Sequence, residues 1–273
     1  MNAVCKRDIL IGIVGGKGRM GNWFFRFLTD AGYQVLVSDM GTELSSEDLA
    51  RRCHVVIVSV PMEAFSSVIG RIGPLMPKDA FLTDLCSLKA VQVQEMLQNT
   101  VCSVAGSHPL FGPAEDSING RRVALCPGRG NEWFEWWRSL LESRGACVHC
   151  TDAASHDRAM AWVQALNHFI LISLGKAVFD QGLDMEELVF LSTPSFSKQM
   201  EIVARLFYQD PQLYATIQMA NPFAANVLHN FLGVCDKLHE AVLRTDRDAF
   251  VELFRSAQAA GKTYMDTVGK QTL

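Results

Sequence analysis

The first 150 residues alternate short apolar, β-branched runs with amphipathic segments, and this alternation limits the fold more than any other feature of the chain. Runs that are apolar on both faces suit strands of a parallel sheet covered by helices on both sides. Between them, apolar residues recur at helical spacing, most clearly from Met20 to Leu28 and from Asn131 to Arg144. We therefore predict an α/β fold with a doubly wound sheet, whose strands cover Ile9–Val14, Gln34–Ser38, Val55–Val60, Phe81–Leu85, Val101–Gly106, Val123–Cys126 and Cys147–Cys150.

After Thr151 the pattern changes, because no convincing strand follows and helical periodicity continues to the end of the chain. Thr151 or Asp152 can cap a long helix that reaches Phe179. Prolines at 194, 211 and 222 suit the first turns of later helices. We predict two domains, residues 1–151 and an all-α domain over 152–273. Its apolar faces form either its own core or, as we expect, a homodimer interface; they contain Phe223, Leu228, Phe231, Leu232, Phe250, Leu253 and Phe254.

Composition excludes several classes of protein. Of 273 residues, 49% are hydrophobic and 20% charged, which supplies a sizeable core and is unlike a disordered chain. The net charge of -4 argues against nucleic-acid binding, which usually needs a basic face. The apolar runs are far shorter than the roughly 20 residues that span a bilayer, and Ile9–Val14 lacks the features of a secretory signal. We expect a cytoplasmic protein that binds neither nucleic acid nor membrane.

The eight cysteines raise the question of a metal or redox site. Cys147 and Cys150 form a C-x-x-C pair, but the sequence holds no second one, and a zinc site needs about four ligands. The nearby His149 would point to the opposite face of a strand from its neighbours. The remaining cysteines lie in apolar runs, where cysteine behaves as a small hydrophobe. We expect reduced core cysteines and no bound metal.

Residues 16–21 fit the G-x-G-x-x-G pattern of dinucleotide-binding loops. The pattern alone is weak evidence, but here it directly follows a predicted strand and opens a predicted helix. The first glycine would permit the tight turn, the second the approach of a pyrophosphate, and the third close packing of helix on strand. The helix start would offer N–H donors to phosphates. The pattern indicates a Rossmann-type domain in which the loop's cofactor-binding residues are Gly16, Gly18, Arg19, Met20 and Gly21; the charges of Lys17 and Arg19 either assist the phosphates or face solvent.

Two further residues follow predicted strands at the same edge. Asp39 lies 23 residues beyond Gly16, where a carboxylate accepts hydrogen bonds from an adenosine ribose. Because a carboxylate would repel a 2′-phosphate, we predict NAD rather than NADP. Ser59 either contacts the nicotinamide ribose or caps the helix that Pro61 begins.

Polar groups also follow the strands predicted near residues 84 and 106. His108 stands at the second of these strand ends, beside Pro109. Oxidation of a hydroxyl by NAD needs a base to take the proton, and histidine suits this role because its ordinary pKa is about 6.5. We therefore predict that His108 faces the nicotinamide as a catalytic base.

Several segments resemble the prephenate dehydrogenase family of tyrosine biosynthesis, most of all the dehydrogenase portion of the fused chorismate mutase–prephenate dehydrogenases. The resemblance covers both predicted domains. The segments that carry it are 14–21, Asp84-Leu85-Cys86-Ser87-Leu88-Lys89, Ser107-His108-Pro109-Leu110-Phe111-Gly112-Pro113, His156-Asp157, Gln164-Ala165-Leu166-Asn167-His168-Phe169 and 201–214.

The resemblance implies a role for each matching polar residue. His108 would accept the proton of the ring hydroxyl, and Ser87 would orient that hydroxyl and the imidazole. Arg205 would bind a substrate carboxylate, for which a planar guanidinium is well suited. The substrate pocket would be completed by Lys89, His168 and Tyr214, with His156 as a weaker candidate.

The implied reaction is NAD-dependent oxidative decarboxylation of prephenate to 4-hydroxyphenylpyruvate. The fused relatives usually have arginine where this chain has Asn167, so one cation fewer is available for the substrate. Oxidation of arogenate or of 4-amino-4-deoxyprephenate therefore stays open. A non-catalytic NAD-binding sensor is a third reading, against which the presence of both Ser87 and His108 argues.

Overall fold

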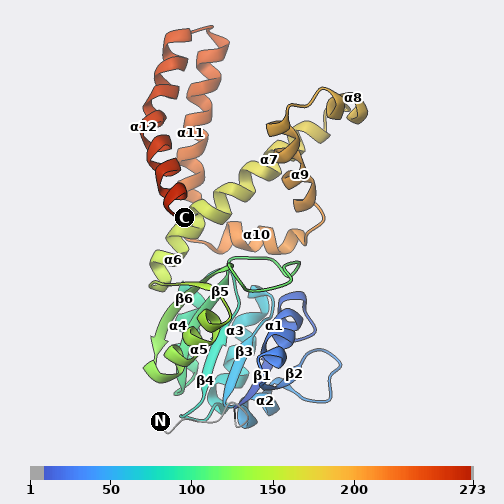
Figure 1. The fold of residues 1–273 in the computed structure, drawn as a ribbon, viewed down its shortest axis with the longest axis vertical. Helices are drawn as coiled ribbons and strands as arrows, with labels where there is room; N and C mark the ends of the chain where they lie inside the picture. The colour runs from blue at the N-terminus through green and yellow to red at the C-terminus, as the bar shows by residue number, and fades with distance from the viewer. Residues whose placement is uncertain (1–8, 272–273) are drawn as a thin grey trace. The chain divides into compact units, whose positions relative to one another are not determined.

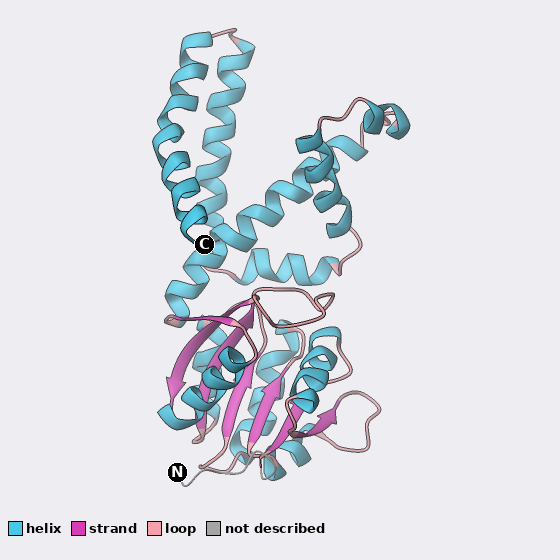
Figure 2. Ribbon diagram, viewed as in Figure 1, coloured by secondary structure: helices cyan, strands magenta, loops and turns pink. Residues whose placement is uncertain are grey.

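A computed structural model describes residues 9–271, except the side chains of the last two of these. Its N-terminal part is a seven-stranded sheet in the order β2-β1-β3-β4-β5-β6-β7 (Figure 2). Strand order reverses between β1 and β3, so the chain winds in both directions from that point, as predicted for a doubly wound sheet. The strands are β1 (Leu10–Val14), β2 (Gln34–Ser38), β3 (Val55–Val58), β4 (Phe81–Asp84), β5 (Ser103–Pro109), β6 (Arg122–Arg129) and β7 (Cys147–Cys150).

Helices cover both faces of this sheet. Alternate residues of each central strand enter two separate cores: Ile57 packs with residues of α1 and α5, whereas Val56 and Val58 pack with residues of α2, α3 and α4. This division explains why the strands are apolar on both faces. The helices are α1 (Arg19–Asp30), α2 (Ser46–Arg52), α3 (Met62–Ile72), α4 (Ala90–Asn99) and α5 (Asn131–Ser143), with a 3-10 turn at Gly73–Leu75.

Strands β6 and β7 run opposite to the other five, which differs from the uniformly parallel sheet that we expected. Strands β1 to β5 pair in parallel, but β5 and β6 pair antiparallel, in a register that places His108 opposite Ala124. The reversal follows from the connection between them, residues 110–121, which contains no helix. A parallel neighbour needs a crossover, whereas a loop returns the chain antiparallel.

The rest of the chain is helical, as predicted, and the fold divides into two compact units after Phe223. The first unit contains the sheet together with α6 (Ala153–Met160), a π-helix (Ala161–Leu166), α7 (Asn167–Phe179), α8 (Met185–Phe190), α9 (Pro194–Leu206) and α10 (Pro211–Ala220). The second unit is the helical hairpin of α11 (Ala224–Leu243) and α12 (Arg247–Gln271) (Figure 1). A domain boundary after Thr151 stays a prediction.

Helix α6, the π-helix and α7 form one continuous helix, Ala153–Phe179. Asp152 caps it by accepting a hydrogen bond from the Ser155 N–H at 2.8 Å, which is one of the two caps that the sequence allows. By length and composition alone, its 27 residues could cross a membrane. We do not assign it to one, because its first turns hold His156 and Asp157 buried in hydrogen bonds at the edge of the sheet.

Candidate active site at the carboxyl edge of the sheet

The glycine loop connects β1 to α1, and the tight turn falls one residue earlier than we predicted. Gly15 has a φ of +80°, and a side chain there would lie less than 3.0 Å from the Ser59 carbonyl. Gly16 needs no such conformation; its missing Cβ makes room for Val37 instead. A Cβ at Gly21 would meet the Gly15 carbonyl at less than 3.0 Å, which confirms that this glycine lets the helix pack on the loop.

Gly18 is the N-cap residue of α1, so the N–H groups of the following residues start the helix. These groups have no acceptor within the helix and carry its positive dipole, which suits an anion such as a pyrophosphate. Arg19 is exposed and its guanidinium donates to the Gln209 side chain at 3.2 Å. The Met20 side chain packs against the apolar core, which leaves its backbone N–H as the group available to a cofactor.

A cavity of about 800 Å³ opens beside this loop. Asp39 lines it, and its two carboxylate oxygens accept the backbone N–H groups of Lys17 and Met40, both at 2.8 Å. Ser59 lines the same cavity, and no side chain caps α3, so capping by Ser59 is not observed. The missing Cβ atoms, the helix start and the carboxylate together fit a dinucleotide.

His108 belongs to a buried chain of hydrogen bonds at the end of β5. Its Nδ1 lies 2.9 Å from Nε2 of His156, whose Nδ1 lies 2.8 Å from Oδ1 of Asp157. That carboxylate also accepts the backbone N–H groups of Lys89 and Ala90, both at 2.8 Å. Because these oxygens act as acceptors, His156 donates through Nδ1 and accepts through Nε2, and His108 donates through Nδ1. The lone pair of His108 Nε2 is therefore left to act as a base.

The electrostatic surroundings keep His108 uncharged. The side chain is 3% exposed, and burial is the main cause that holds its pKa well below the ordinary value of about 6.5. The nearby His156 and Lys89 lower that pKa further. A neutral imidazole is the form that can accept a proton.

Gln164 is the group that meets this lone pair. Its Nε2 lies 3.4 Å from Nε2 of His108, so the amide donates to the imidazole. The residue sits in the π-helix, an irregularity that occurs often at functional sites. Its Oε1 is buried and has no hydrogen-bond partner within the described residues.

Lys89 is not placed as we predicted. Its side chain is fully buried; the ammonium pairs with Asp84 and donates to the Ser107 carbonyl at 3.0 Å. An ammonium desolvated in this way needs its carboxylate partner and has no surface to offer a substrate. The structure therefore does not bring the Lys89 ammonium to a surface, and its role in binding substrate stays a prediction. The ion pair instead fixes the backbone directly before His108, since Asp84 also lies 3.4 Å from the Ser107 N–H.

Ser87 follows β4 as expected and is half-buried. The structure places no hydrogen bond between it and His108, whose two ring nitrogens face His156 and Gln164. In this structure the imidazole is held by residues of the helix 153–179, and the role of Ser87 stays a prediction.

His168 and Tyr214 lie together, with ring centroids 4.6 Å apart. Burial lowers the pKa of His168 and raises that of Tyr214, and Nδ1 of His168 is buried without a partner within the described residues. Helix α10 carries Tyr214 (Figure 1). The Thr216 hydroxyl on α10 donates a hydrogen bond to Glu63 on α3, one of the helices that cover the sheet. Arg205 lies on α9 and is 80% exposed, with Glu201 at 3.7 Å; no contact joins it to His108 in this structure.

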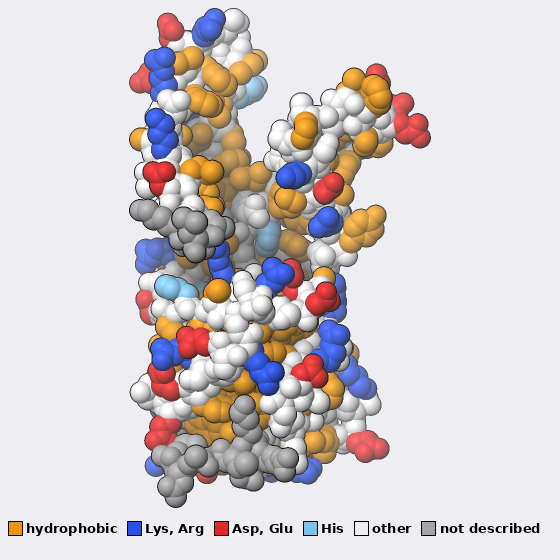
Figure 3. All heavy atoms as spheres, in the orientation of Figure 1, with side chains coloured by type: hydrophobic (Ala, Val, Ile, Leu, Met, Phe, Trp, Pro, Cys, Tyr) orange, Lys and Arg blue, Asp and Glu red, His pale blue; other side chains and the backbone are white. Residues whose placement is uncertain are grey.

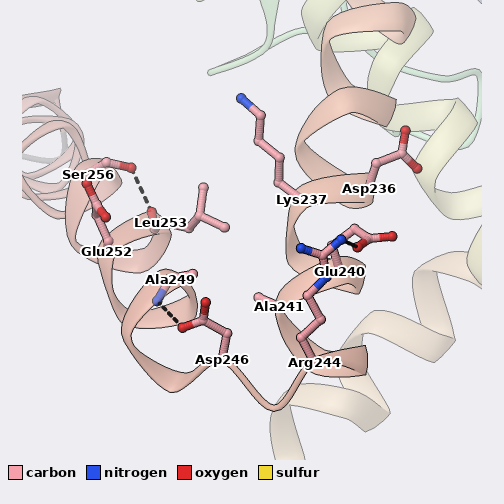
Figure 4. A pocket seen from close by; sticks show the side chains of 10 residues that line it. All are labelled: Asp236, Lys237, Glu240, Ala241, Arg244, Asp246, Ala249, Glu252, Leu253 and Ser256. Carbon is pink, nitrogen blue, oxygen red and sulfur yellow. Dashed lines mark hydrogen bonds and ion pairs between the residues drawn. The ribbon is translucent and has the colours of Figure 1, made fainter.

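A second cavity, of about 570 Å³, lies between α11 and α12 (Figure 4). Two of its polar side chains are bound locally: Arg244 pairs with Glu240 at 2.9 Å, and Asp246 caps α12 by accepting from the Ala249 N–H. Unlike the edge of the sheet, this cavity does not combine a candidate base with a glycine loop that could bind phosphates. The described residues contain no cluster of three or more metal-ligating side chains.

Three residues of the site were missed as functional groups from the sequence. Asp157 and Gln164 stand inside segments that resemble the family, so their presence was visible but their roles were not. Asp84 was recognised only as a polar residue at a strand end. A signal for it was available, because an acid at the end of an apolar strand five residues before a lysine invites a buried pair.

Comparison with known proteins identifies the family of both domains. The family model described as the nucleotide-binding domain of prephenate dehydrogenase matches residues 30–150, and the one described as its dimerization domain matches residues 152–256. The glycine loop precedes the first match. A solved prephenate dehydrogenase from Aquifex aeolicus, in complex with hydroxyphenyl propionate and NAD+, has a TM-score of 0.72 at 18% identity and covers 96% of this chain and 100% of its own, which is a likeness of fold.

Curated relatives include the T-protein of Enterobacter agglomerans, 34% identical over 246 residues, which are 90% of this chain and 66% of the relative. The probable arogenate/prephenate dehydrogenase of Methanocaldococcus jannaschii is 30% identical over 269 residues, covering 92% of this chain and 60% of the relative. The chain thus spans less than two thirds of the length of these relatives. Since both domain models match in order along the sequence, the chain belongs to the prephenate dehydrogenase family.

Proposed function

We propose that this protein oxidises and decarboxylates prephenate to 4-hydroxyphenylpyruvate, with NAD as the hydride acceptor. The observation that carries the proposal is the lone pair of His108 Nε2, held unprotonated by the chain through His156 to Asp157 at the carboxyl edge of a nucleotide-binding sheet. A protein that only sensed NAD would need no such base.

The reaction follows from this arrangement. His108 takes the proton of the hydroxyl at ring carbon C4, while His156 and Asp157 stabilise the imidazolium that forms. Bound NAD would supply the acceptor for the hydride that leaves the same carbon. The new carbonyl draws electrons through the ring as the ring carboxylate departs as carbon dioxide, and aromatisation makes the step effectively irreversible.

The cofactor assignment rests on Asp39. Its carboxylate lines the cavity beside the glycine loop, where it would accept hydrogen bonds from a ribose and repel a 2′-phosphate. We expect the variant Asp39→Asn to lose preference for NAD over NADP, measured as the ratio of kcat/KM for the two cofactors. An unchanged ratio would remove this support.

The substrate is a dicarboxylate, and we propose that Arg205, His168 and Tyr214 bind it. Arg205 supplies an exposed guanidinium. The other two form a half-buried pair in which one ring nitrogen of His168 has no partner among the described residues. Asn167 is neutral where the fused relatives usually have a cation, which keeps arogenate and 4-amino-4-deoxyprephenate as competing substrates.

We also propose a homodimer. Hydrophobic side chains gather at the surface of the helical part of the molecule (Figure 3). Large ones stay exposed on the segment that matches the dimerization domain, for example Phe190 at 88%, Tyr208 at 88% and Phe254 at 64%. Monomeric soluble proteins rarely leave such surfaces uncovered. Sedimentation equilibrium should give twice the mass of one chain; a single-chain mass would contradict the proposal.

One assay tests the function directly. The purified protein is mixed with NAD or NADP and with prephenate, arogenate or 4-amino-4-deoxyprephenate, and the absorbance of reduced nicotinamide is followed. We expect the highest kcat/KM for prephenate with NAD. Turnover of an amino substrate alone would replace the substrate assignment, and binding of NAD without turnover of any of the three would favour a sensor.

A further inference from the structure

Among the described residues, Gln164 is the one whose side chain contacts the reactive nitrogen of His108. The chain of donors and acceptors from Asp157 leaves Nε2 of His108 as an acceptor, so the atom that faces it from Gln164 is the NH2 group. This fixes the orientation of the amide and turns its Oε1 away from the imidazole. The contact is long, at 3.4 Å, and therefore weak.

The amide is only half satisfied. Gln164 Oε1 is buried without a partner within the described residues, and an unpaired buried carbonyl oxygen is costly. The π-helix projects the side chain from a backbone segment that packs on α10, since the Gln218 side chain donates to the Ala165 carbonyl at 2.7 Å. The backbone of Gln164 is thus held in place, while its end group keeps a weak bond that a ligand can replace.

We propose that Gln164 is a catalytic residue that binds the oxygen at the reacting carbon of the substrate, a role that the family resemblance had suggested for Ser87. The inference rests on the proposed function. When substrate binds, its hydroxyl group replaces Gln164 as the hydrogen-bond donor to Nε2 of His108. The displaced amide then donates its N–H to the oxygen of that hydroxyl group. Ser87 forms no hydrogen bond to His108 in the structure, whereas Gln164 does.

The contribution of this donor grows during the reaction. The O–H bond breaks as its proton moves to His108 Nε2, the C4–H bond breaks as hydride leaves with its electron pair for NAD, and a C=O bond forms. Negative charge develops on the oxygen before the carbonyl is complete, and a fixed N–H donor stabilises charge that develops in a transition state. Loss of one such donor costs about 10²–10³ in kcat in comparable sites.

The test compares three variants with the parent enzyme. Gln164→Met keeps the size of the side chain but removes both hydrogen-bonding atoms, and Gln164→Glu keeps an acceptor but removes the donor. Gln92→Met is the matched control, because Gln92 is buried, has an unpartnered Oε1 within the described residues, and has no hydrogen bond to His108. For each, kcat and KM are measured with prephenate and NAD, together with the pH profile of kcat/KM.

We expect Gln164→Met to lower kcat about 10²-fold with a much smaller change in KM, and Gln92→Met to match the parent. In Gln164→Glu the added carboxylate beside His108 should move the acid limb of the profile to higher pH, in addition to a low kcat. That shift would show that position 164 lies beside the imidazole, whereas the loss of kcat without a matching change in KM in Gln164→Met reports the donor itself.

Each contrary outcome is distinct. A kcat within about twofold of the parent for Gln164→Met overturns the inference alone, as does an equal loss in Gln92→Met. If the parent enzyme turns over none of the three candidate substrates, the proposed function fails, and the inference fails with it.

Discussion

Nδ1 of His108 lies 2.9 Å from Nε2 of His156, although 48 residues separate them in the sequence and they belong to a strand and a helix of different layers. Through this contact His108 becomes the last member of a hydrogen-bond chain that starts at Asp157, and each bond in the chain has a fixed donor and acceptor. Because Asp157 accepts from His156, the chain selects the tautomer in which His108 is a base at Nε2.

Replacement of His108 by asparagine should remove the base and keep much of the polarity of the site. A general base contributes about 10²–10⁴ in rate, so we expect a fall in kcat of that size with little change in KM for prephenate. Steady-state kinetics of His108→Asn check this. A variant that turns over as fast as the parent would show that the proton leaves by another route.

The variant His156→Phe tests the hydrogen-bond chain from Asp157 to His108 rather than the base itself. It removes the acceptor for the N–H of His108, and hydrogen bonds to charged groups contribute about 1.5–3 kcal/mol, or about 10- to 160-fold. We expect kcat to fall by that factor while NAD binding is unchanged, since His156 lies away from the glycine loop. A change in the Kd for NAD equal to the loss in kcat would point to general disruption.

The pH dependence follows from the lowered pKa of His108. The neutral imidazole is the active form, and burial holds its pKa well below about 6.5. On acidification, kcat/KM should therefore stay constant through pH 6.5 and fall only at clearly lower pH, with a slope of one proton. A profile that bends at about 6.5 would mean that the base is exposed or is a different histidine.

Replacement of Arg205 by alanine should raise KM for prephenate strongly, because a carboxylate contact acts on the ground state and the transition state alike. Arg244→Ala is the matched control: Arg244 is 75% exposed and pairs with a glutamate one turn away, as Arg205 does at 80% exposure. We expect the control to keep the KM of the parent. An unchanged KM in Arg205→Ala would make the carboxylate assignment wrong.

Substitution of alanine for Gly21 should weaken NAD binding, because the added Cβ would lie less than 3.0 Å from the Gly15 carbonyl and push α1 from the loop. Gly70→Ala is the control, since nothing lies within 4 Å of a Cβ in that helix position, and there alanine should stabilise the helix by about 0.5–1 kcal/mol. Isothermal titration with NAD and thermal unfolding measure the two effects. Equal NAD affinity in Gly21→Ala and the parent would show that the loop tolerates the shift.

Much of the fold was predictable because the signals for it are local. Strands and helices are indicated by the spacing of apolar residues, and the glycine loop and the cap at Asp152 by the conformations that single residues prefer. The seven strands and the helical half were therefore placed correctly from the sequence. The reversal at β6 was not, because a strand has the same period whichever way it runs. Only the length and content of the loop after β5 decide its direction.

The sequence by itself determined that strands of a nucleotide-binding sheet end near His108 and Asp39, because strand ends and glycine turns can be recognised from a few neighbouring residues. What only the tertiary structure decided is which polar groups pair. Lys89 faces Asp84 instead of a ligand, and Gln164 reaches His108 across 56 residues, with a π-helix setting its position. Such pairs depend on how buried groups satisfy one another once water is excluded, and that is settled by the packing of distant segments rather than by any spacing along the chain.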